Sequence, residues 1–279
     1  FEDESLWPDH YGPAECSMAK ALLSDLSIPA PLTQMAAPQS CAFPQAGFYL
    51  MKSRTVYSAI FAGPIGTEGG GGHSHDDKLS FTFTLKERDF IVDPGIYVYT
   101  ASKQYRDAYR SCHSHNTVCV DDEPQNRPLE DSPWWGCHDD TQCEVLHWAE
   151  TAGRVVFEAQ HQGYRRLPAR IVHRRKIELD EGRSVYEVRD FFESKSSDEL
   201  RPKMSFNLML HPDCEIVSND AGAAVVRNGG TEIKVEAIDG EWSISAGWVS
   251  PSYGVKCPTN RLTLLRDPGV TENCLRLSW

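Results

Sequence analysis

The feature that most constrains the fold is a series of short runs in which apolar and polar residues alternate. Leu79-Ser-Phe-Thr-Phe-Thr-Leu85 is the clearest run, and a period of two is typical of a strand with one buried face. Turn-forming residues separate the runs, as at 180–182, 219–222, 228–230 and 239–240. Further strand-like runs lie at 48–50, 56–60, 117–120, 143–149, 155–159, 171–179, 185–192, 204–210, 223–226, 233–238, 242–246, 262–265 and 274–279.

These runs predict an all-β protein, a large antiparallel β-sandwich of two stacked sheets over residues 38–279. A chain of 279 residues, of which 40% are hydrophobic, is long enough for such a core. Residues 1–37 differ, because Pro13 and the helix formers after it predict one short helix, and Pro29 and Pro31 then predict an extended segment. We expect this part to be a connector from an upstream domain.

Net charge excludes one class of partner. The formal charge of −12 argues against nucleic acid, which needs a basic face, and an acidic glycan would need a local basic site.

No apolar run approaches the roughly twenty residues of a membrane helix, so no membrane span is expected. No signal peptide is visible, and the oligomeric state stays open, a homodimer included.

The nine cysteines give little framework, because an odd number cannot pair fully within one chain. None forms a CxxC pair, so a cysteine-based zinc site is not expected. Buried thiols are the default interpretation, with room for one disulfide. Cys112 and Cys119 share one strand-like stretch.

One region carries candidate metal ligands. Four glycines at 69–72 lead into His73-Ser-His75-Asp-Asp77, and Asp93-Pro-Gly95 and His113-Ser-His115-Asn116 follow. On an extended chain the two histidines of H-x-H point the same way. Imidazoles with a carboxylate suit zinc. A solvated polar loop is the alternative.

The same segments resemble a known family. Residues 72–81, 92–99 and 109–121 are similar to the C-terminal domain of the heparinase II/III-like family, and 161–167 followed by His173-Arg-Arg175 looks like a later family segment. The resemblance extends from about Gly47 to His211. It implies a β-sandwich paired with an (α/α) toroid, which together cleave uronic-acid polysaccharides by β-elimination.

Carried over by position, the resemblance implies that His75, Asp93 and His115 hold zinc, and that His73 faces the cleft as a catalytic or substrate-orienting residue. We favour a structural zinc that holds the loop bearing His73. Other catalytic groups would come from the toroid, so the isolated chain is expected to be inactive.

Lyase chemistry needs a group that neutralises the uronate carboxylate and a proton donor for the leaving oxygen. Arg106, Arg110 and His113 are candidates for the first task, and Tyr105 or Tyr109 for the second or for stacking on sugar. The alternative is a surface strand or loop with solvated arginines and half-buried tyrosines.

Two other segments carry weaker signals. His161 and Arg165, with Arg166, form a second basic patch that either contacts glycan or is an exposed strand edge. The run 173–176 is interpreted as a solvated strand face. Trp134-Trp135 is either a sugar platform or a loop packed into the sandwich.

Two other functions stay open. A non-catalytic carbohydrate-binding or structural sandwich would keep the metal motif for stability alone. A cupin-like metal oxygenase also uses H-x-H followed by a later histidine. For the lyase, a bacterial periplasm or cell envelope is the expected location, and the acidic glycan that it cleaves is not specified.

Overall fold

The computed structural model describes residues 39–66, 70–132, 134–194, 202–220, 222–266 and 269–279, which lie in one compact unit, Gln39–Trp279. The helix and connector predicted for residues 1–37 lie outside the described residues. In the described part of the chain, no helix is long and apolar enough to cross a membrane.

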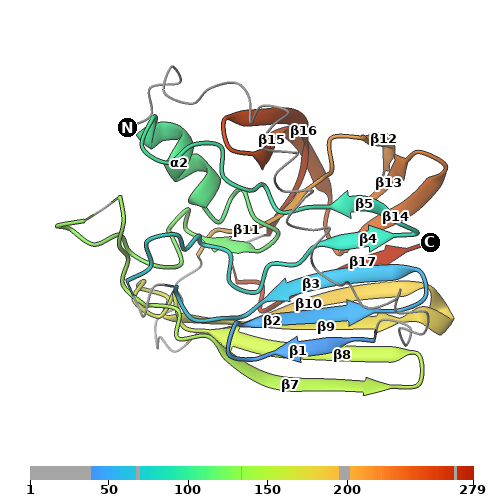
Figure 1. Ribbon diagram of the computed structural model, residues 1–279. Coiled ribbons are helices and arrows are strands. Elements are labelled where there is room, and N and C mark those ends of the chain that lie inside the picture. Colours follow the sequence, from blue (N-terminus) through green and yellow to red (C-terminus); the bar gives the residue numbers. More distant parts are fainter. Residues whose placement is uncertain (1–38, 67–69, 133, 195–201, 221, 267–268) are drawn as a thin grey trace, which may run out of the picture. The chain divides into compact units, whose positions relative to one another are not determined.

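One layer of the fold is an eight-stranded antiparallel sheet (Figure 1). Its strand order is β12-β13-β14-β17-β10-β9-β8-β7. The strands are β7 (Glu144–Thr151), β8 (Arg154–His161), β9 (Ile171–Asp180), β10 (Val185–Ser194), β12 (Cys214–Asp220), β13 (Ala223–Asn228), β14 (Thr231–Ile238) and β17 (Glu272–Ser278). A 3-10 turn, η2 (Glu181–Arg183), joins β9 to β10 where the sequence predicts a turn.

The second layer consists of two sheets. A five-stranded sheet contains β1 (Cys41–Phe43), β2 (Phe48–Lys52), β3 (Val56–Phe61), β4 (Phe83–Leu85) and β5 (Arg88–Ile91). A four-stranded sheet, in the order β15-β16-β11-β6, contains β6 (Val118–Val120), β11 (Met204–Met209), β15 (Trp242–Ser252) and β16 (Val255–Arg266). A bridge between Ile91 and Leu210 links the two sheets.

The two layers pack through large side chains. The ring centroids of Tyr49 and Phe157 are 5.0 Å apart, and those of Phe83 and Tyr186 are 5.2 Å apart. At the other end of the eight-stranded sheet, the Trp242 indole donates to the Val235 carbonyl at 3.1 Å. The predicted all-β sandwich is therefore confirmed, with the difference that one of its two layers is split into two sheets.

The core follows the period of two. In β9, residues 171, 173, 175, 177 and 179 are buried, and the outward positions from 174 to 180 are partly exposed. His173 and Arg175 thus point inward with Ile177 and Leu179, and both are fully buried. The prediction of a solvated face for them is wrong, because their positions place them on the core side.

Several elements differ from the expected pattern. Strands β1, β5 and β12 were not predicted, and the run 79–85 forms a strand only from Phe83, since Leu79 has a φ of +62°. A helix that was not predicted, α2 (Lys103–Arg110), begins after Ser102, whose hydroxyl caps the Tyr105 amide. An ion pair between Lys103 and Asp107, one turn apart, adds to it.

Candidate functional site

The glycine-rich loop approaches its neighbours too closely for a side chain. Gly71 has a φ of +65°, and a Cβ there would lie 2.3 Å from the Cys137 sulfur. The loop is then tied to the end of α2, because Arg110 Nε donates to the Ser74 carbonyl at 3.0 Å and the Asp76 amide donates to the Arg110 carbonyl at 2.8 Å. Arg110 therefore positions the loop that carries His73 and His75.

A second loop presents Asp93. The Gly95 amide donates to Asp93 Oδ1 at 2.9 Å, which fixes the carboxylate. Gly95 has a φ of +70°, and a Cβ there would lie 2.4 Å from the Ser250 carbonyl oxygen, so close packing against β15 requires a glycine at this position. The Ser250 amide donates to the Pro94 carbonyl at 2.8 Å.

Three of the predicted residues form a chain of contacts. His115 Nδ1 donates to Asp93 Oδ2 at 2.8 Å, and His115 Nε2 lies 3.2 Å from His75 Nδ1. The imidazole of His115 is fully buried, whereas the Asp93 carboxylate is half-exposed. Because Asp93 accepts the Nδ1 proton, Nε2 of His115 presents a lone pair toward His75. We refer to these three residues as the His75–His115–Asp93 chain.

Burial and the nearby charges set the protonation of this chain. Burial, with the charge of His115 as the next cause, lowers the pKa of His75 to about 3. Burial alone would lower the pKa of His115, but the Asp93 carboxylate outweighs it and raises that pKa. Burial also raises the pKa of the adjacent Asp76 to about 6. A neutral His75 can offer a nitrogen lone pair to a metal.

The two histidines fit zinc better than the full predicted set does. Two nitrogens bound to zinc at about 2.0–2.1 Å in a tetrahedron are roughly 3.3 Å apart, close to what is found here. Asp93 contacts the other ring nitrogen of His115, which is how a carboxylate orients a metal-bound histidine. Oδ1 of Asp77 is buried and has no hydrogen-bond partner among the residues that the structure describes, and Asp77 and Asp93 line one cavity of about 240 Å³.

His113 lies in a different cluster. Its Nε2 is 3.2 Å from Asp122 Oδ1, and its ring lies beside the disulfide between Cys112 and Cys119. Among the described residues, Cys112, His113 and Cys119 are the one set of candidate ligands whose atoms lie within 4.8 Å of one another. The sulfurs are bonded to each other here, so the cluster is a structural link around the loop that carries His115. No CxxC spacing marks this cluster in the sequence.

His73 is exposed and lies among aromatic rings. Its ring centroid is 5.3 Å from that of Tyr99 and 6.1 Å from that of Trp135. Residues 72 and 73 lie in a turn, and no part of 72–75 is a strand, so the strand argument for parallel histidines does not apply. His75 turns to His115, while His73 faces the rings.

Four predicted site residues lie on helix α2, and they differ in exposure. Tyr105 is exposed, and its hydroxyl accepts from Lys256 Nζ at 3.0 Å. Arg106 and Tyr109 are buried, which corrects the alternative of solvated arginines and half-buried tyrosines. Arg106 lies 5.0 Å from the Trp135 ring centroid, and its Nε and Nη1 atoms have no hydrogen-bond partner among the described residues.

Tyr109 is poorly placed for catalysis. Its hydroxyl is buried without a hydrogen-bond partner, and burial raises its pKa to about 12. Its nearest aromatic neighbour is Tyr97, at 6.2 Å between ring centroids. The phenol therefore stays protonated, and Tyr105 is the better exposed of the two predicted donors.

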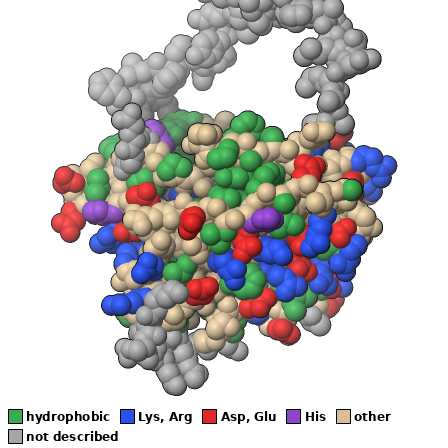
Figure 2. Space-filling model, turned by 90° about the horizontal axis from the view of Figure 1, so that it is seen from below, with side chains coloured by type: hydrophobic (Ala, Val, Ile, Leu, Met, Phe, Trp, Pro, Cys, Tyr) green, Lys and Arg blue, Asp and Glu red, His purple; other side chains and the backbone are tan. Residues whose placement is uncertain are grey.

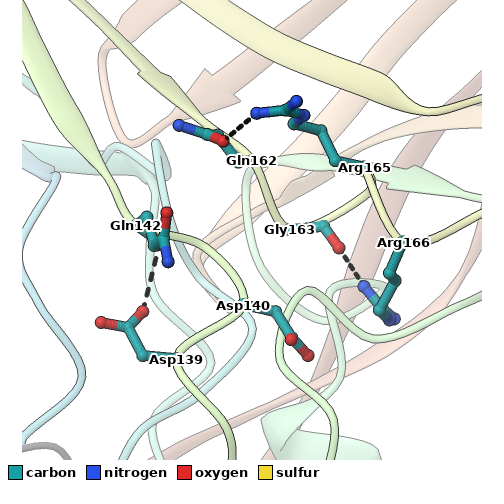
Figure 3. A pocket seen from close by; sticks show the side chains of 7 residues that line it. All are labelled: Asp139, Asp140, Gln142, Gln162, Gly163, Arg165 and Arg166. Atoms are coloured by element: carbon teal, nitrogen blue, oxygen red, sulfur yellow. Dashed lines mark hydrogen bonds between the residues drawn. The ribbon is translucent and has the colours of Figure 1, made fainter. Parts of the chain in front are cut away.

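The second predicted patch is split between core and surface. His161 is fully buried, and its Nε2 lies 3.1 Å from His173 Nδ1, so the prediction that His161 contacts glycan is wrong. Arg165 is exposed at a polar pocket of about 270 Å³, where it donates to the Gln162 side chain (Figure 3). Arg166 in the same pocket is directed to the Gly163 carbonyl. The pocket is lined by Asp139, Asp140, Gln142, Gln162, Gly163, Arg165 and Arg166.

A buried ion pair behind the site was missed. Arg175 Nε donates to Asp190 Oδ1 at 2.6 Å, and His173 Nε2 contacts the same oxygen at 2.7 Å. Arg175 Nη1 also donates to the carbonyls of Leu79 and Asn116 at 2.7 and 2.8 Å. The period of two in β9 was the signal that could have found it.

The exposed charges of the sandwich do not form a basic face in the view of Figure 2, where Lys and Arg side chains are mixed with Asp and Glu. Ion pairs on the eight-stranded sheet explain the mixing, such as Arg154 with Glu178 at 2.6 Å and Arg174 with Glu158 at 2.7 Å. Recognition of an acidic glycan therefore needs a local cation.

A family model described as heparinase II/III-like, C-terminal, matches residues 35–277. Among solved structures, heparan sulfate lyase HepC from Pedobacter heparinus has a TM-score of 0.71 and 17% sequence identity, and the match covers 94% of this chain and 40% of that one. Heparinase III has a TM-score of 0.69 and 14% identity, with coverage of 88% and 37%. The chain thus spans less than half of these solved chains.

A 4-alpha-glucanotransferase from Thermococcus litoralis has a TM-score of 0.50 and 8% identity, with coverage of 88% of this chain and 40% of that one. Likenesses at such low identity show the fold, and a fold alone does not determine a reaction. The search of the curated proteins found no match.

Proposed function

Because this chain belongs to the heparinase II/III-like family through that family's C-terminal domain, we propose that it is the β-sandwich part of a polysaccharide lyase. The lyase would cleave a uronic-acid glycan by β-elimination. The observation that carries the proposal is the exposed His73, held among aromatic rings two residues before the His75–His115–Asp93 chain. Because the chain spans 40% of a solved lyase chain, we include an (α/α) toroid as the partner domain.

The reaction requires removal of the proton at C5 of the uronate and protonation of the leaving oxygen at C4. His73 would contact substrate as a base or orienting group, since its ring is exposed. Tyr105 would donate the proton to the leaving oxygen. Lys256 donates to the Tyr105 oxygen, which leaves the Tyr105 O–H available to donate outward.

The uronate carboxylate must be neutralised while charge builds at C5. Arg106 is 1% exposed, and its Nε and Nη1 atoms have no hydrogen-bond partner among the described residues. We propose that it supports this task through its positive charge, held against the Trp135 ring, and not by direct contact with substrate. Arg110 acts differently, since its Nε is used to hold the Ser74 carbonyl. We therefore assign Arg110 to positioning the loop and not to substrate.

Zinc belongs to the proposal as a structural element. His75 Nδ1 and His115 Nε2 would hold it, and Asp93 would orient His115. When bound, the ion would supply a fixed positive centre that joins the loop at 70–78 to the segment before β6. By holding His75, the ion would keep the loop at 70–78, and with it His73, in place.

The test compares the parent protein with this chain on heparan-type, alginate-type and bacterial exopolysaccharide substrates, by the ultraviolet absorbance of the unsaturated uronate product. We expect cleavage of one substrate by the parent, no turnover by this chain alone, and a loss of about 10²-fold or more in the parent's His73→Ala variant. His147→Ala, at an exposed position of β7, is the matched control. Turnover by this chain alone would contradict the need for the toroid. An unaffected His73→Ala variant would contradict the role of His73 and favour a non-catalytic sandwich.

A further inference from the structure

Aromatic side chains from four separate segments meet beside His73. Tyr97 and Tyr99 come from the loop after Asp93, Tyr105 from α2, and Trp135 from the loop before β7. The β15–β16 hairpin adds Trp248 and Tyr253. We refer to these six residues, with Lys256, as the ring platform.

The platform is continuous. The rings of Tyr99 and Tyr253 are stacked, with centroids 5.8 Å apart and an interplanar angle of 25°. Tyr99 also lies 6.1 Å from Trp135, at an angle of 35°. These three rings form a row that passes His73, which contacts both Tyr99 and Trp135.

Lys256 occupies the other part of the platform. Its Nζ lies 4.2 Å from the Tyr105 ring centroid, 4.5 Å from that of Trp248 and 5.3 Å from that of Tyr97. Three rings and the Tyr105 hydroxyl thus hold one ammonium group in place. Among the described residues, no carboxylate is found in an ion pair with this ammonium, so its charge is open to an anion from outside.

The backbone holds the two parts in register. The Gly254 amide donates to the Tyr97 carbonyl at 2.8 Å, and the Ser250 hydroxyl donates to the Ile96 carbonyl at 3.0 Å. The hairpin is therefore fixed on the loop that also presents Asp93. A preformed surface of this kind loses little conformational freedom when a ligand binds.

Three observations indicate the chemistry of the occupant. Trp135, Trp248 and Tyr253 are 42%, 44% and 51% exposed, which is a large aromatic area to leave in water. Each ring of the platform carries a hydroxyl or an indole N–H, so the surface combines stacking faces with hydrogen-bonding groups. Arg106, 1% exposed, lies against Trp135 and adds a positive charge there, and in the described part of the chain two of its guanidinium nitrogens have no hydrogen-bond partner.

We propose that the ring platform binds a uronate-containing oligosaccharide, with sugar rings stacked on the row Trp135, Tyr99 and Tyr253 and a uronate carboxylate paired with Lys256. The apolar C–H face of a pyranose matches an aromatic face, and the carboxylate matches the caged ammonium. This inference rests on the proposed function, and it extends the substrate contacts beyond His73 onto the β15–β16 hairpin.

The test is calorimetric titration of this chain with heparosan, alginate and neutral cello-oligosaccharides of equal length. We expect one uronate ligand to bind, and Tyr253→Ala to weaken it about tenfold, as loss of a stacking ring does. Lys256→Gln should weaken the uronate by a similar factor and leave the weak neutral ligand unaffected. Tyr57→Ala, which removes an exposed ring of β3, is the matched control and should leave the affinity for the uronate ligand unchanged.

Absence of binding by every uronate probe would overturn the proposal. Unchanged affinity in both platform variants, with thermal unfolding as for the parent chain, would do so too. The assay needs neither turnover nor the toroid, so failure of the platform and failure of the lyase proposal can be distinguished. If the platform binds glycan while His73→Ala leaves the parent enzyme unaffected, the lyase proposal fails and the platform stands.

Discussion

Arg175 donates a hydrogen bond of 2.8 Å to the carbonyl of Asn116, the residue that follows His115. Arg175 lies in β9, in the eight-stranded layer, and Asn116 precedes β6 in the other layer. The Asn116 side chain in turn donates to the carbonyls of Phe81 and Val92 at 2.8 and 2.9 Å. The loop of His115 is thus fixed from the opposite sheet, by a guanidinium that is paired with Asp190.

Replacing Arg175 should destabilise the fold severely. Arg175→Met leaves the Asp190 carboxylate buried without its cation, which costs on the order of 3–5 kcal/mol of unfolding free energy. Urea unfolding measures it. Arg174→Met is the matched control, since the adjacent Arg174 pairs with Glu158 on the outer face and should cost less than about 1 kcal/mol. Equal losses in the two variants would contradict the role assigned to the buried pair.

Acid should destabilise the protein through its buried histidines. Burial lowers the pKa of His161 well below its ordinary value of 6.5, and it lowers the pKa of His173 as well. The unfolded chain therefore binds protons that the folded chain does not, so their contribution is complete above pH 6.5 and is lost as the pH falls below it. Each such histidine adds a slope of about 1.4 kcal/mol per pH unit.

His161→Gln should flatten that slope by about one proton below the ordinary histidine pKa. The measurement is the free energy of unfolding from urea titrations across mildly acidic pH. His147→Gln, an exposed histidine in β7, should reproduce the parent profile. A parent-like profile in His161→Gln would show that His161 does not titrate as its burial requires.

The period of two predicted nearly all strands, because alternation reports which side chains face the core. It did not by itself reveal that His173 and Arg175 are core residues. A buried charge is tolerated only when it has a partner, and the partner, Asp190, lies on another strand. Helix α2 was missed because its eight residues are too few to show a helical period. Its cap at Ser102 was the available local signal.

The sequence motifs predicted which loops form the candidate site, but not the contacts between their side chains. H-x-H, D-P-G and the second H-x-H identified the loops, but spacing could not show which nitrogen of His115 meets Asp93. The ring platform was harder still, because Trp248, Tyr253 and Lys256 reach the site only through the β15–β16 hairpin. Of the platform residues, only Tyr105, as a candidate proton donor or stacking ring, and Trp135, in a Trp-Trp pair, stood out in the sequence.

The disulfide should stabilise both the fold and the loop of His115. Cys112 and Cys119 are separated by 7 positions and enclose His115. Closing so short a loop is worth about 2–3 kcal/mol by its effect on the unfolded chain. We expect Cys112→Ser with Cys119→Ser to lower the urea midpoint accordingly, and Cys41→Ser, at a partly exposed free thiol, to leave it unchanged. An unchanged midpoint in the double variant would contradict this role.

Asp93→Asn separates an orienting carboxylate from a metal ligand. An amide still accepts the His115 Nδ1 proton but raises the basicity of the ligating Nε2 less than a carboxylate does, so zinc affinity should fall by about 10–100-fold without being abolished. Competition with a chromogenic chelator measures the affinity. Complete loss of zinc would make Asp93 a direct ligand, and no change would remove it from the site.

The most direct test of the account is the zinc content of the purified protein and of its His75→Ala variant. We expect close to one zinc per chain in the parent, little zinc in His75→Ala, and as much zinc in His147→Ala as in the parent. All three proteins should show a cooperative thermal unfolding transition, which shows that each is folded. A parent chain that binds no zinc from a zinc-containing buffer, or a His75→Ala variant that keeps it, would contradict the assignment of His75 and His115 as ligands.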